Sequence, residues 1–241
     1  MPVLVVIPAR LGSTRLPHKP LQPLGGVPLI VRVAQRVLEY RIADRLVIAT
    51  DAEAVIAAAE AAGLDARMTS TRHASGTDRV HELGSRGEFD RYDELVNVQG
   101  DTPFIPAAAV TGALAQLRKG FDLGTAAVPL DGDAEDPSRV KVVMTQEGRA
   151  LYFSRAAIPH GADRVWRHLG VYAYTRDTLR RIAMAPPSPL EQSERLEQLR
   201  ALELGLSIGV ERLSEPAPPE IDTWEDLREA ENHWTVTQGV T

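Results

Sequence analysis

The chain has 241 residues, 44% hydrophobic and 25% charged, a balance typical of a folded globular protein and not of a disordered or fibrous one. Its formal net charge of −6 argues against nucleic-acid binding and against a polybasic membrane anchor. No apolar run approaches the roughly 20 residues that a membrane-spanning helix needs, so no contact with a membrane is expected. Because the chain has no cysteine, disulfides, thiolate zinc sites and thiol nucleophiles are excluded, and a cytoplasmic location is expected.

Strands and helices are predicted to alternate through the first half of the chain. Apolar runs predict strands over residues 3–7, 46–50 and 95–99. Helical spacing of apolar residues, alanine-rich composition or a leading proline predicts helices over residues 29–38, 53–62 and 106–119. Alternation of this kind is typical of a parallel sheet covered by helices on both faces, so an α/β fold is expected.

The pattern changes after about residue 120. Residues 140–144 and 150–153 read as two strands joined by a tight turn, which predicts a β-hairpin. Further elements are predicted as a strand over 168–175, a helix over 190–204, a strand over 208–213 and a helix over 224–233. We interpret residues 1–241 as one α/β domain into which a hairpin region, about 140–175, is inserted.

The segment of residues 10–19 directly follows the first predicted strand and is rich in cations. Arg10, Arg15 and Lys19 share it with a glycine and two hydroxyl side chains, and prolines keep it from becoming helical. Ligands in open parallel sheets bind beyond the carboxyl ends of the strands. Such a loop can neutralise and donate to a polyphosphate, although a solvated charged loop is the alternative interpretation. The sequence lacks the P-loop and dinucleotide glycine motifs, the Gly-x-Ser-x-Gly elbow and a His-x-x-x-His zinc pair.

Two aspartates are candidates for holding a divalent cation. Asp101 follows the predicted strand 95–99, where a carboxylate suits Mg²⁺, but it is also placed to cap the next helix. Asp222 precedes the last predicted helix, and either Asp222 or Thr223 is a good cap for that helix. The sequence alone leaves both alternatives open.

Three further segments carry polar residues of interest. Residues 73–79 place small donors and Arg79 before a helix, which suits a loop that reads a base or ribose but equally a plain helix start. His168 and Tyr172 are four residues apart on one predicted strand, so their side chains lie on the same side of it. They would either line a ligand site or be buried structural residues. Glu197 and Gln198 lie at the edge of an apolar helix face, where a solvated position is the ordinary interpretation.

Taken together in order, ten short motifs resemble those of 3-deoxy-manno-octulosonate cytidylyltransferase, the CMP-Kdo synthetase family. The motifs are Ile7–Arg10, Ser13–Pro17, Lys19–Leu21, Ala49–Asp51, Ser75–Arg79, Asn97–Asp101, Tyr152–Arg155, His168–Tyr172, Leu196–Arg200 and Ile221–Thr223. The resemblance covers nearly the whole chain. It implies a Rossmann-like, GT-A-like nucleotidyltransferase fold, a three-layer sandwich with a mostly parallel sheet and an inserted hairpin.

The resemblance also implies an activity and a set of roles. The reaction joins CTP to the sugar acid Kdo and releases diphosphate, in the service of lipopolysaccharide synthesis. By similarity, Arg10, Lys19 and Asp101 are catalytic, and Asp101 with Asp222 holds Mg²⁺. CTP is expected at Ala9, Arg10, Lys19, Ser75, Gly76, Arg79 and Asp101. The sugar acid is expected at Arg15, Gln99, Arg155, His168, Tyr172, Glu197 and Gln198.

The family is further expected to form a homodimer through the inserted hairpin region. Two alternative activities stay open at this point. One is a cytidylyltransferase for a different sugar acid, and the other is a GT-A-type glycosyltransferase that consumes a sugar nucleotide.

Overall fold

A computed structural model of the chain describes residues 1–73, 75–215 and 219–238. The contacts between its residues divide the chain into two compact units. The first unit consists of Pro2–Arg91, Asn97–Ile105 and Pro218–Thr241, and the second of Met1, Tyr92–Val96 and Pro106–Ala217. The prediction of one domain over residues 1–241 stays a prediction, and each unit is described by itself.

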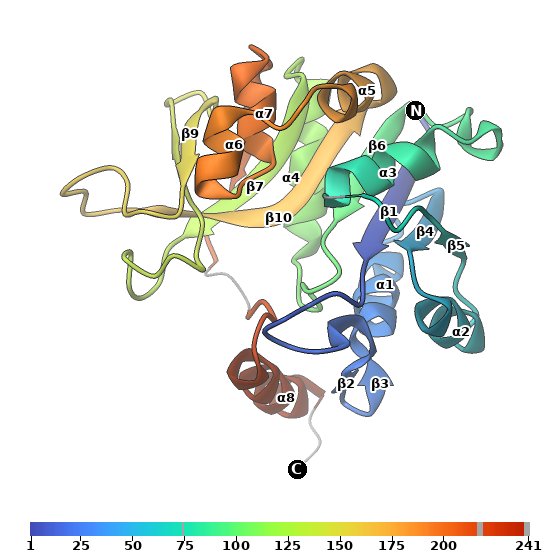
Figure 1. Ribbon diagram of the computed structural model, residues 1–241. Coiled ribbons are helices and arrows are strands. Elements are labelled where there is room, and N and C mark those ends of the chain that lie inside the picture. Colours follow the sequence, from blue (N-terminus) through green and yellow to red (C-terminus); the bar gives the residue numbers. More distant parts are fainter. Residues whose placement is uncertain (74, 216–218, 239–241) are drawn as a thin grey trace. The chain divides into compact units, whose positions relative to one another are not determined.

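The first unit is built on three parallel strands, β1 (Val3–Ala9), β4 (Arg45–Thr50) and β5 (Ala66–Met68) (Figure 1). Val6 of β1 pairs with Val47 of β4, and Ile48 of β4 pairs with Ala66 of β5. All the residues from Leu4 to Ile7 are fully buried, so β1 is covered on both faces. That burial explains why the strand reads as an uninterrupted apolar run.

The helices described in the first unit are α1 (Leu29–Glu39), α2 (Glu53–Ala61), α3 (Gly76–Gly84) and α8 (Trp224–Gln238). Its smaller elements are the hairpin β2 (Pro23–Leu24) and β3 (Val27–Pro28) and the 3₁₀ turns Lys19–Leu21 and Gly87–Phe89. Helix α1 buries Ile30, Val33 and Val37 at helical spacing, as predicted. Helix α2 ends where predicted, because Gly63 adopts a φ of 70°.

Strand β6 (Glu94–Val98) crosses the division, since its residues up to Val96 belong to the second unit and those from Asn97 to the first. All five of its residues are buried. The loop after β6 lies in the first unit, so residues 99–105 are placed with β1 and α1.

The second unit contains β7 (Leu123–Pro129), β10 (Trp166–Thr175) and β11 (Ile208–Arg212). β10 runs antiparallel to β7, and β11 runs parallel to it. The predicted hairpin is confirmed as β8 (Lys141–Met144) and β9 (Ala150–Ser154), which pair antiparallel. Helix α4 (Ala107–Arg118) packs against β7, β10 and β11 (Figure 1). Three shorter helices complete the unit: α5 (Arg176–Met184), α6 (Pro189–Glu194) and α7 (Gln198–Glu203).

The prediction of one continuous helix over 190–204 is wrong. Helix α6 ends at Glu194 and is followed by Arg195, which adopts the left-handed conformation with a φ of 55°. Helix α7 begins at Gln198. The break lets the buried Arg200 donate to both carboxylate oxygens of Glu191, at 2.7 and 2.6 Å. In a continuous helix these residues would be separated by about 13.5 Å along the axis, too far for this pair.

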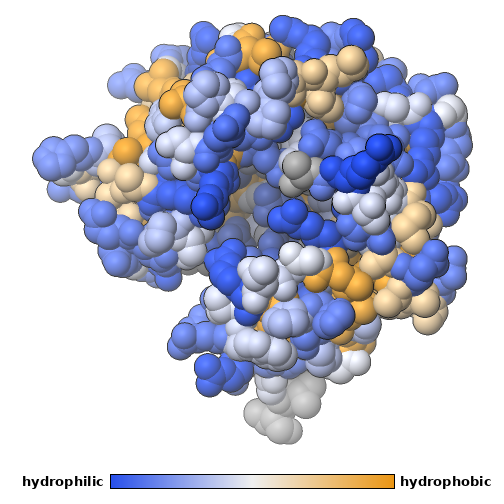
Figure 2. Space-filling model, in the orientation of Figure 1, coloured by the Kyte–Doolittle hydropathy of each residue, from blue (hydrophilic) through white to orange (hydrophobic). Residues whose placement is uncertain are grey.

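Several of the described elements were absent from the sequence prediction: β5, β7, α5, the short hairpin of β2 and β3, and the two 3₁₀ turns. The proline-rich connection at residues 215–219 falls mostly on residues 216–218, which lie outside the described residues. Among the helices that the structure describes, none has the length and apolar character needed to cross a bilayer. The face drawn in Figure 2 is largely hydrophilic, with hydrophobic residues in small separate groups.

Candidate functional site

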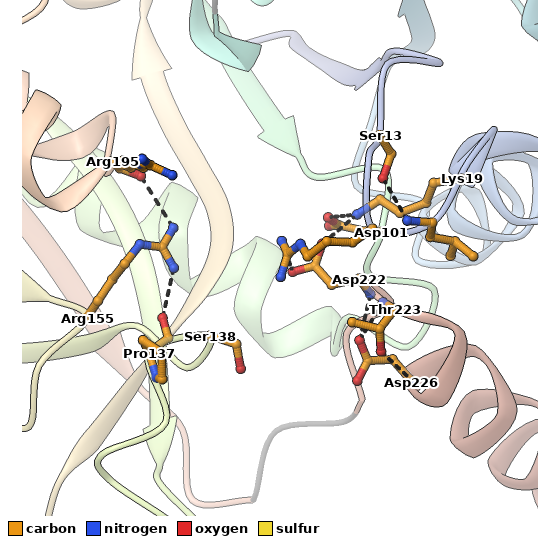
Figure 3. Close-up of polar contacts among 12 residues, drawn as sticks. Ser13, Lys19, Asp101, Pro137, Ser138, Arg155, Arg195, Asp222, Thr223 and Asp226 are labelled. Atoms are coloured by element: carbon orange, nitrogen blue, oxygen red, sulfur yellow. Dashed lines mark hydrogen bonds and ion pairs between the residues drawn. The ribbon is translucent and has the colours of Figure 1, made fainter.

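Lys19 lies between two aspartates that are far away in the sequence (Figure 3). Its Nζ donates to Asp101 Oδ2 at 2.7 Å and to Asp222 Oδ1 at 2.9 Å. Asp222 Oδ2 also pairs with the Arg15 guanidinium, at 3.0 Å. We call Lys19, Asp101 and Asp222 the Lys–Asp cluster; all three residues belong to the first unit.

A close backbone approach places Asp101. Gly100 precedes it, and a Cβ atom at Gly100 would lie 2.9 Å from the Pro8 carbonyl oxygen and 3.1 Å from Ile30 Cδ1. Only a glycine lets the loop after β6 pass this close to the end of β1. Thr102 then closes the turn, because its hydroxyl donates to the Gln99 carbonyl at 2.8 Å. Asp101 therefore does not cap α4, whose capping position is Pro106.

The start of α8 places Asp222. Thr223 Oγ1 accepts from the Asp226 N–H at 3.2 Å, so Thr223 is the capping residue and Asp222 is left to face Lys19. Asp226 Oδ2 accepts in turn from the N–H groups of Asp222 and Thr223, at 2.9 and 2.7 Å. One residue earlier, the N–H of the fully buried Ile221 donates to the Asp101 carbonyl at 3.0 Å. The backbone itself thus ties the two aspartates together.

The charges in the cluster support one another. Burial would lower the pKa of Lys19, but the charges of Asp101 and Asp222 outweigh it, so the pKa of Lys19 lies above its ordinary value. Burial would raise the pKa of Asp222, but Lys19 and then Arg15 outweigh it, so the pKa of Asp222 lies below its ordinary value. The ammonium and the Asp222 carboxylate are therefore both charged at neutral pH.

The donor set of the cluster fits a hard divalent cation. Asp101 Oδ1 is buried and has no hydrogen-bond partner among the described residues, so one oxygen of this carboxylate is left for a ligand. Among the residues that the structure describes, no group of three or more His, Asp or Glu side chains is arranged to hold a metal. Two carboxylates with the remaining positions filled by phosphate and water is the usual arrangement for Mg²⁺.

The basic loop between β1 and the cluster is anchored at one point. Leu16 is fully buried, and its N–H donates to Ser13 Oγ at 3.3 Å. Arg10 and Arg15 are exposed, whereas only 16% of the Lys19 side chain is exposed. The loop therefore buries one apolar side chain and presents its two arginines to solvent, as expected of an anion-binding segment.

Residues 75–79 form the start of α3, and their side chains have distinct roles. Ser75 caps the helix by accepting from the Asp78 N–H at 3.1 Å, and Gly76 is the first helical residue. A Cβ atom at Gly76 would lie 3.4 Å from Pro8 Cγ, so this helix end lies near the end of β1, where Ala9 is buried. Of the two interpretations of residues 73–79, the structure confirms the helix start, and Arg79 lies within the helix and not before it. Arg79 is buried inside α3 and donates to Asp51 Oδ2 at 2.7 Å and to Thr69 Oγ1 at 2.5 Å.

The residues expected at the sugar acid fall into two groups. Arg15 and the exposed Gln99 belong to the first unit, and Arg155, His168, Tyr172, Glu197 and Gln198 belong to the second. The rings of His168 and Tyr172 lie on one side of β10, with their centroids 5.2 Å apart, as their spacing predicted. Gln198 is buried at the start of α7, and its Nε2 has no hydrogen-bond partner in the part of the chain that the structure describes, which leaves a donor for a ligand.

Arg155 is held by backbone oxygens. Its guanidinium donates to the carbonyls of Glu194 at 2.8 Å, Pro137 at 2.8 Å and Arg195 at 3.4 Å (Figure 3). Within the described residues, these contacts use three of the five guanidinium N–H groups, which leaves two for a ligand. The side chain is thereby fixed in one orientation.

His168 is buried and neutral. Burial, with a smaller effect of Arg167, lowers the pKa of His168 from 6.5 to about 3. The Thr125 hydroxyl donates to the Val171 carbonyl at 2.7 Å, so Thr125 Oγ1 is left to accept from His168 Nε2 at 3.0 Å. The imidazole therefore serves as a hydrogen-bond donor within the second unit and not as a cation.

Sequence reasoning missed two residues of the site. The Asp226 carboxylate orients Asp222, and the Thr223-x-x-Asp226 spacing is that of a capping box, a signal visible in the sequence. Asp51 lies just before α2, whose capping position is Ala52, and it pairs with Arg79. Nothing in the local sequence indicates that long-range pair.

Comparison with known proteins gives consistent results. Residues 4–208 match the model of the family described as cytidylyltransferase. A 3-deoxy-manno-octulosonate cytidylyltransferase from Gemmatimonas aurantiaca is 50% identical, over 98% of this chain and 95% of its own. One of the same name from Azorhizobium caulinodans is 46% identical, over 95% of this chain and 94% of its own.

Solved structures agree with the sequence relatives. The structure of a CMP:2-keto-3-deoxy-manno-octonic acid synthetase complexed with CTP matches over 100% of both chains, with a TM-score of 0.90 and 36% identity. A glucose-1-phosphate thymidylyltransferase from Bacillus anthracis, described as putative, covers 96% of this chain and 95% of its own, with a TM-score of 0.69 and 16% identity. The latter likeness concerns the fold alone. The fold is thus the predicted mixed α/β, Rossmann-like nucleotidyltransferase fold with a mostly parallel central sheet.

Proposed function

The chain belongs to the 3-deoxy-manno-octulosonate cytidylyltransferase family, and from this premise we propose that it transfers CMP from CTP to Kdo. The products are CMP-Kdo and diphosphate. The observation that carries the proposal within this structure is the Lys–Asp cluster, in which a lysine and two carboxylates converge beside a basic loop. A glycosyltransferase binds the diphosphate group of a sugar nucleotide, which needs fewer cationic side chains than a triphosphate and fewer than this loop offers.

In the reaction that we propose, the anomeric hydroxyl oxygen of the sugar acid attacks the α-phosphorus of CTP. The new phosphorus–oxygen bond forms as the bond to the β-phosphate oxygen breaks, diphosphate leaves, and the hydroxyl proton passes to solvent. Arg10 and Lys19 neutralise the negative charge that gathers on the phosphates, and the cluster holds the triphosphate in line for attack.

We propose Mg²⁺ as the cofactor, held by Asp101 and Asp222. The partnerless Asp101 Oδ1 and the position of Asp222 next to Lys19 support this assignment. When bound, the ion would supply charge neutralisation on the phosphates and would lower the pKa of the attacking hydroxyl. No histidine base is then required, which agrees with the buried, neutral state of His168.

The nucleoside of CTP is assigned to the start of α3 and the end of β1. We propose that Ala9, Ser75 and Gly76 contact it directly, since Gly76 and Pro8 lie close together. Arg79 is buried and paired with Asp51 and Thr69, which supports a role in holding the start of α3 in place.

The sugar acid is assigned to the residues that the family resemblance implies. They are Arg15, Gln99, Arg155, His168, Tyr172, Glu197 and Gln198. The two remaining guanidinium N–H groups of Arg155 and the partnerless Gln198 Nε2 support this assignment, because a carboxylate and hydroxyls need such donors. Gln198→Ala should raise the KM for Kdo and leave the KM for CTP unchanged. A rise in both KM values would contradict the assignment of Gln198 to the sugar acid.

Diphosphate release tests the proposed reaction. The protein is incubated with Mg²⁺ and Kdo and with either CTP or UTP, and a parallel set omits Kdo. Release that requires both CTP and Kdo supports the proposal. Release of diphosphate with UTP but not with CTP, release without the sugar acid, or no release at all would contradict the proposal. Activity with only a different 2-keto sugar acid would show that Kdo is not the substrate.

We also propose that the protein acts in the cytoplasm and that its product enters lipopolysaccharide synthesis. The absence of cysteine supports the first statement, and the family resemblance supports the second. Depleting the protein in its own organism should reduce Kdo-containing lipid, whereas unchanged lipid would contradict the second statement.

A homodimer formed through the hairpin region is likewise a proposal. The family resemblance supports it, and Leu151 on β9, which exposes 57% of its surface, is a residue of the hairpin at which the interface can be tested. Sedimentation equilibrium should give a mass of twice 26.3 kDa for the wild-type protein and a weaker dimer for Leu151→Asp. A monomer at all concentrations would contradict it.

A further inference from the structure

The Lys19 ammonium uses the carboxylate oxygens that a divalent cation would need. Nζ is 2.7 Å from Asp101 Oδ2 and 2.9 Å from Asp222 Oδ1, so both aspartates direct an oxygen at the same positive charge. Two cations that shared these oxygens would repel each other. The side chain of Lys19 is only 16% exposed, which places this pairing away from bulk solvent.

We propose that Lys19 and the divalent cation compete for Asp101 and Asp222, so that the metal binds tightly only after CTP has drawn Lys19 onto its phosphates. This inference rests on the proposed function and adds the order of binding to it. Lys19 neutralises the two carboxylates until the nucleotide arrives and then neutralises the nucleotide.

The chemistry of the side chain suits this exchange. Lysine carries a compact charge on a flexible four-carbon stem, so its ammonium can move between acceptors. A triphosphate offers several charged oxygens, each a strong acceptor for an ammonium group. Once Lys19 has moved, Asp101 presents both the released Oδ2 and the buried, partnerless Oδ1 to an incoming cation.

Arg15 is a weaker competitor for the same site. It pairs with Asp222 only, through Oδ2 at 3.0 Å, and 59% of its side chain is exposed. Exposed ion pairs of this kind contribute little and break easily. The competition therefore concerns Lys19, which contacts both aspartates.

Coupling between the two ligands follows from this arrangement. If CTP removes a competitor of the metal, then CTP raises the affinity for the metal, and the metal must raise the affinity for CTP by the same factor. Couplings of this type are typically 5- to 150-fold, so we expect about 10-fold or more.

Binding of Mn²⁺ without nucleotide tests the competition directly. Free Mn²⁺ is measured by electron paramagnetic resonance with the wild-type protein, Lys19→Met, Lys19→Arg and the control Lys119→Met, a surface lysine with 59% of its side chain exposed. Lys19→Met should bind Mn²⁺ about 10-fold tighter than wild type or better. Lys19→Arg keeps the charge and should stay as weak as wild type, and Lys119→Met should be unchanged. The double variant Lys19→Met with Asp101→Asn should lose the increase in Mn²⁺ affinity that Lys19→Met alone produces.

Water-proton relaxation then measures Mn²⁺ bound to the wild-type protein with CTP and no sugar acid. One possible result is that the wild-type protein binds Mn²⁺ in the presence of CTP, while wild type and Lys19→Met bind Mn²⁺ equally well in the absence of CTP. This result would overturn the competition and leave the proposed function standing. No uptake even with CTP would overturn the proposed metal site itself.

A measurement on the wild-type chain keeps the proposal falsifiable if Lys19→Met does not fold. The chain has three lysines, Lys19, Lys119 and Lys141, so ¹³Cε-labelled lysine gives three signals. CTP without metal should shift the Lys19 signal and leave that of Lys119 unchanged, whereas millimolar Mg²⁺ alone should leave Lys19 in place. A shift on Mg²⁺ alone, or none on CTP, would overturn the proposal.

Discussion

The backbone N–H of Asp222 donates to Asp226 Oδ2 at 2.9 Å, so a carboxylate of the candidate site is oriented by another carboxylate four residues further along the chain. The same Oδ2 accepts from the Thr223 N–H at 2.7 Å. Helix α8 therefore begins with a fixed geometry that aims the Asp222 side chain at Lys19. Asp226 itself needs no contact with substrate to influence the reaction.

Replacing Asp226 by alanine should loosen this geometry. The loss of the cap contacts should lower the free energy of unfolding by about 1 kcal/mol. The Mg²⁺ concentration for half-maximal activity should rise by more than kcat falls, because the affected residue is a proposed metal ligand, and Asp226→Asn, which keeps an acceptor oxygen, should recover part of the effect.

Thr175→Ala is the matched control for Asp226→Ala. Thr175 caps α5 by accepting from the Thr178 N–H at 3.1 Å, and α5 carries no candidate site residue. This variant should lose similar stability and keep the wild-type Mg²⁺ dependence. If both variants changed the Mg²⁺ dependence equally, Asp226 would have only a structural role.

Asp101→Asn and Lys19→Ala should each lower the turnover number about 100-fold or more, since each removes a charge proposed to stabilise the transition state. The rate of diphosphate release at saturating CTP, Kdo and Mg²⁺ measures the effect. Lys119→Ala is the control for a lysine outside the site and should keep the wild-type rate. Rates near wild type in both site variants would refute the assigned roles.

Gly100→Ala should destabilise the first unit and displace Asp101. The added Cβ would lie 2.9 Å from the Pro8 carbonyl oxygen, and backbone atoms cannot move as a flexible side chain does. We expect a loss of about 1 to 3 kcal/mol in the free energy of unfolding, measured with urea. Gly12→Ala, where a Cβ would meet nothing within 4 Å, should cost far less. Equal losses in the two variants would show that the close approach is not required.

The free energy of unfolding should decrease as the pH is lowered, and part of this decrease should come from His168. The folded state keeps its pKa at about 3, whereas an exposed histidine has an ordinary value of 6.5. Between these values the unfolded chain binds the extra proton, so the free energy of unfolding decreases as the pH falls below about 6.5. From pH 7.5 to pH 5.5 the contribution of this residue is about 1 kcal/mol.

His168→Gln should remove that contribution, so urea titrations should show a smaller loss of stability between pH 7.5 and pH 5.5 than in wild type. The exposed His160 provides the control variant, His160→Gln, which should retain the wild-type dependence. An identical pH dependence in wild type and His168→Gln would contradict the buried, neutral assignment.

The parts of the fold that the sequence predicts well are those with a strong local signal. Residues 3–7 are apolar throughout because β1 is covered on both faces, and Gly63 ends α2 because it supplies a positive φ. The break at Arg195 carries no such signal. It is set by the buried pair of Glu191 and Arg200, which forms only once the chain has folded back.

The site shows the same division. The rule that ligands bind beyond the carboxyl ends of strands predicts that the loop after β1 and Asp101 belong to the site. The sequence leaves two roles open for Asp222, helix cap or metal ligand. The contact of Lys19 with both aspartates joins residues 82 and 203 positions apart, which periodicity cannot reveal. Arg79 also shows this limit, because it lies in α3 and its partner Asp51 lies just after β4, 28 residues earlier in the sequence.

The central claim is that the Lys–Asp cluster supports transfer of CMP to a sugar acid. Phosphorus NMR of a mixture of the protein, CTP, Kdo and Mg²⁺ tests it most directly. The account predicts that the CTP signals decline while a phosphodiester signal and diphosphate grow in equal amounts, and that Asp101→Asn nearly abolishes both. Persistence of CTP, its conversion to CDP and phosphate, or undiminished product formation by Asp101→Asn would contradict the account.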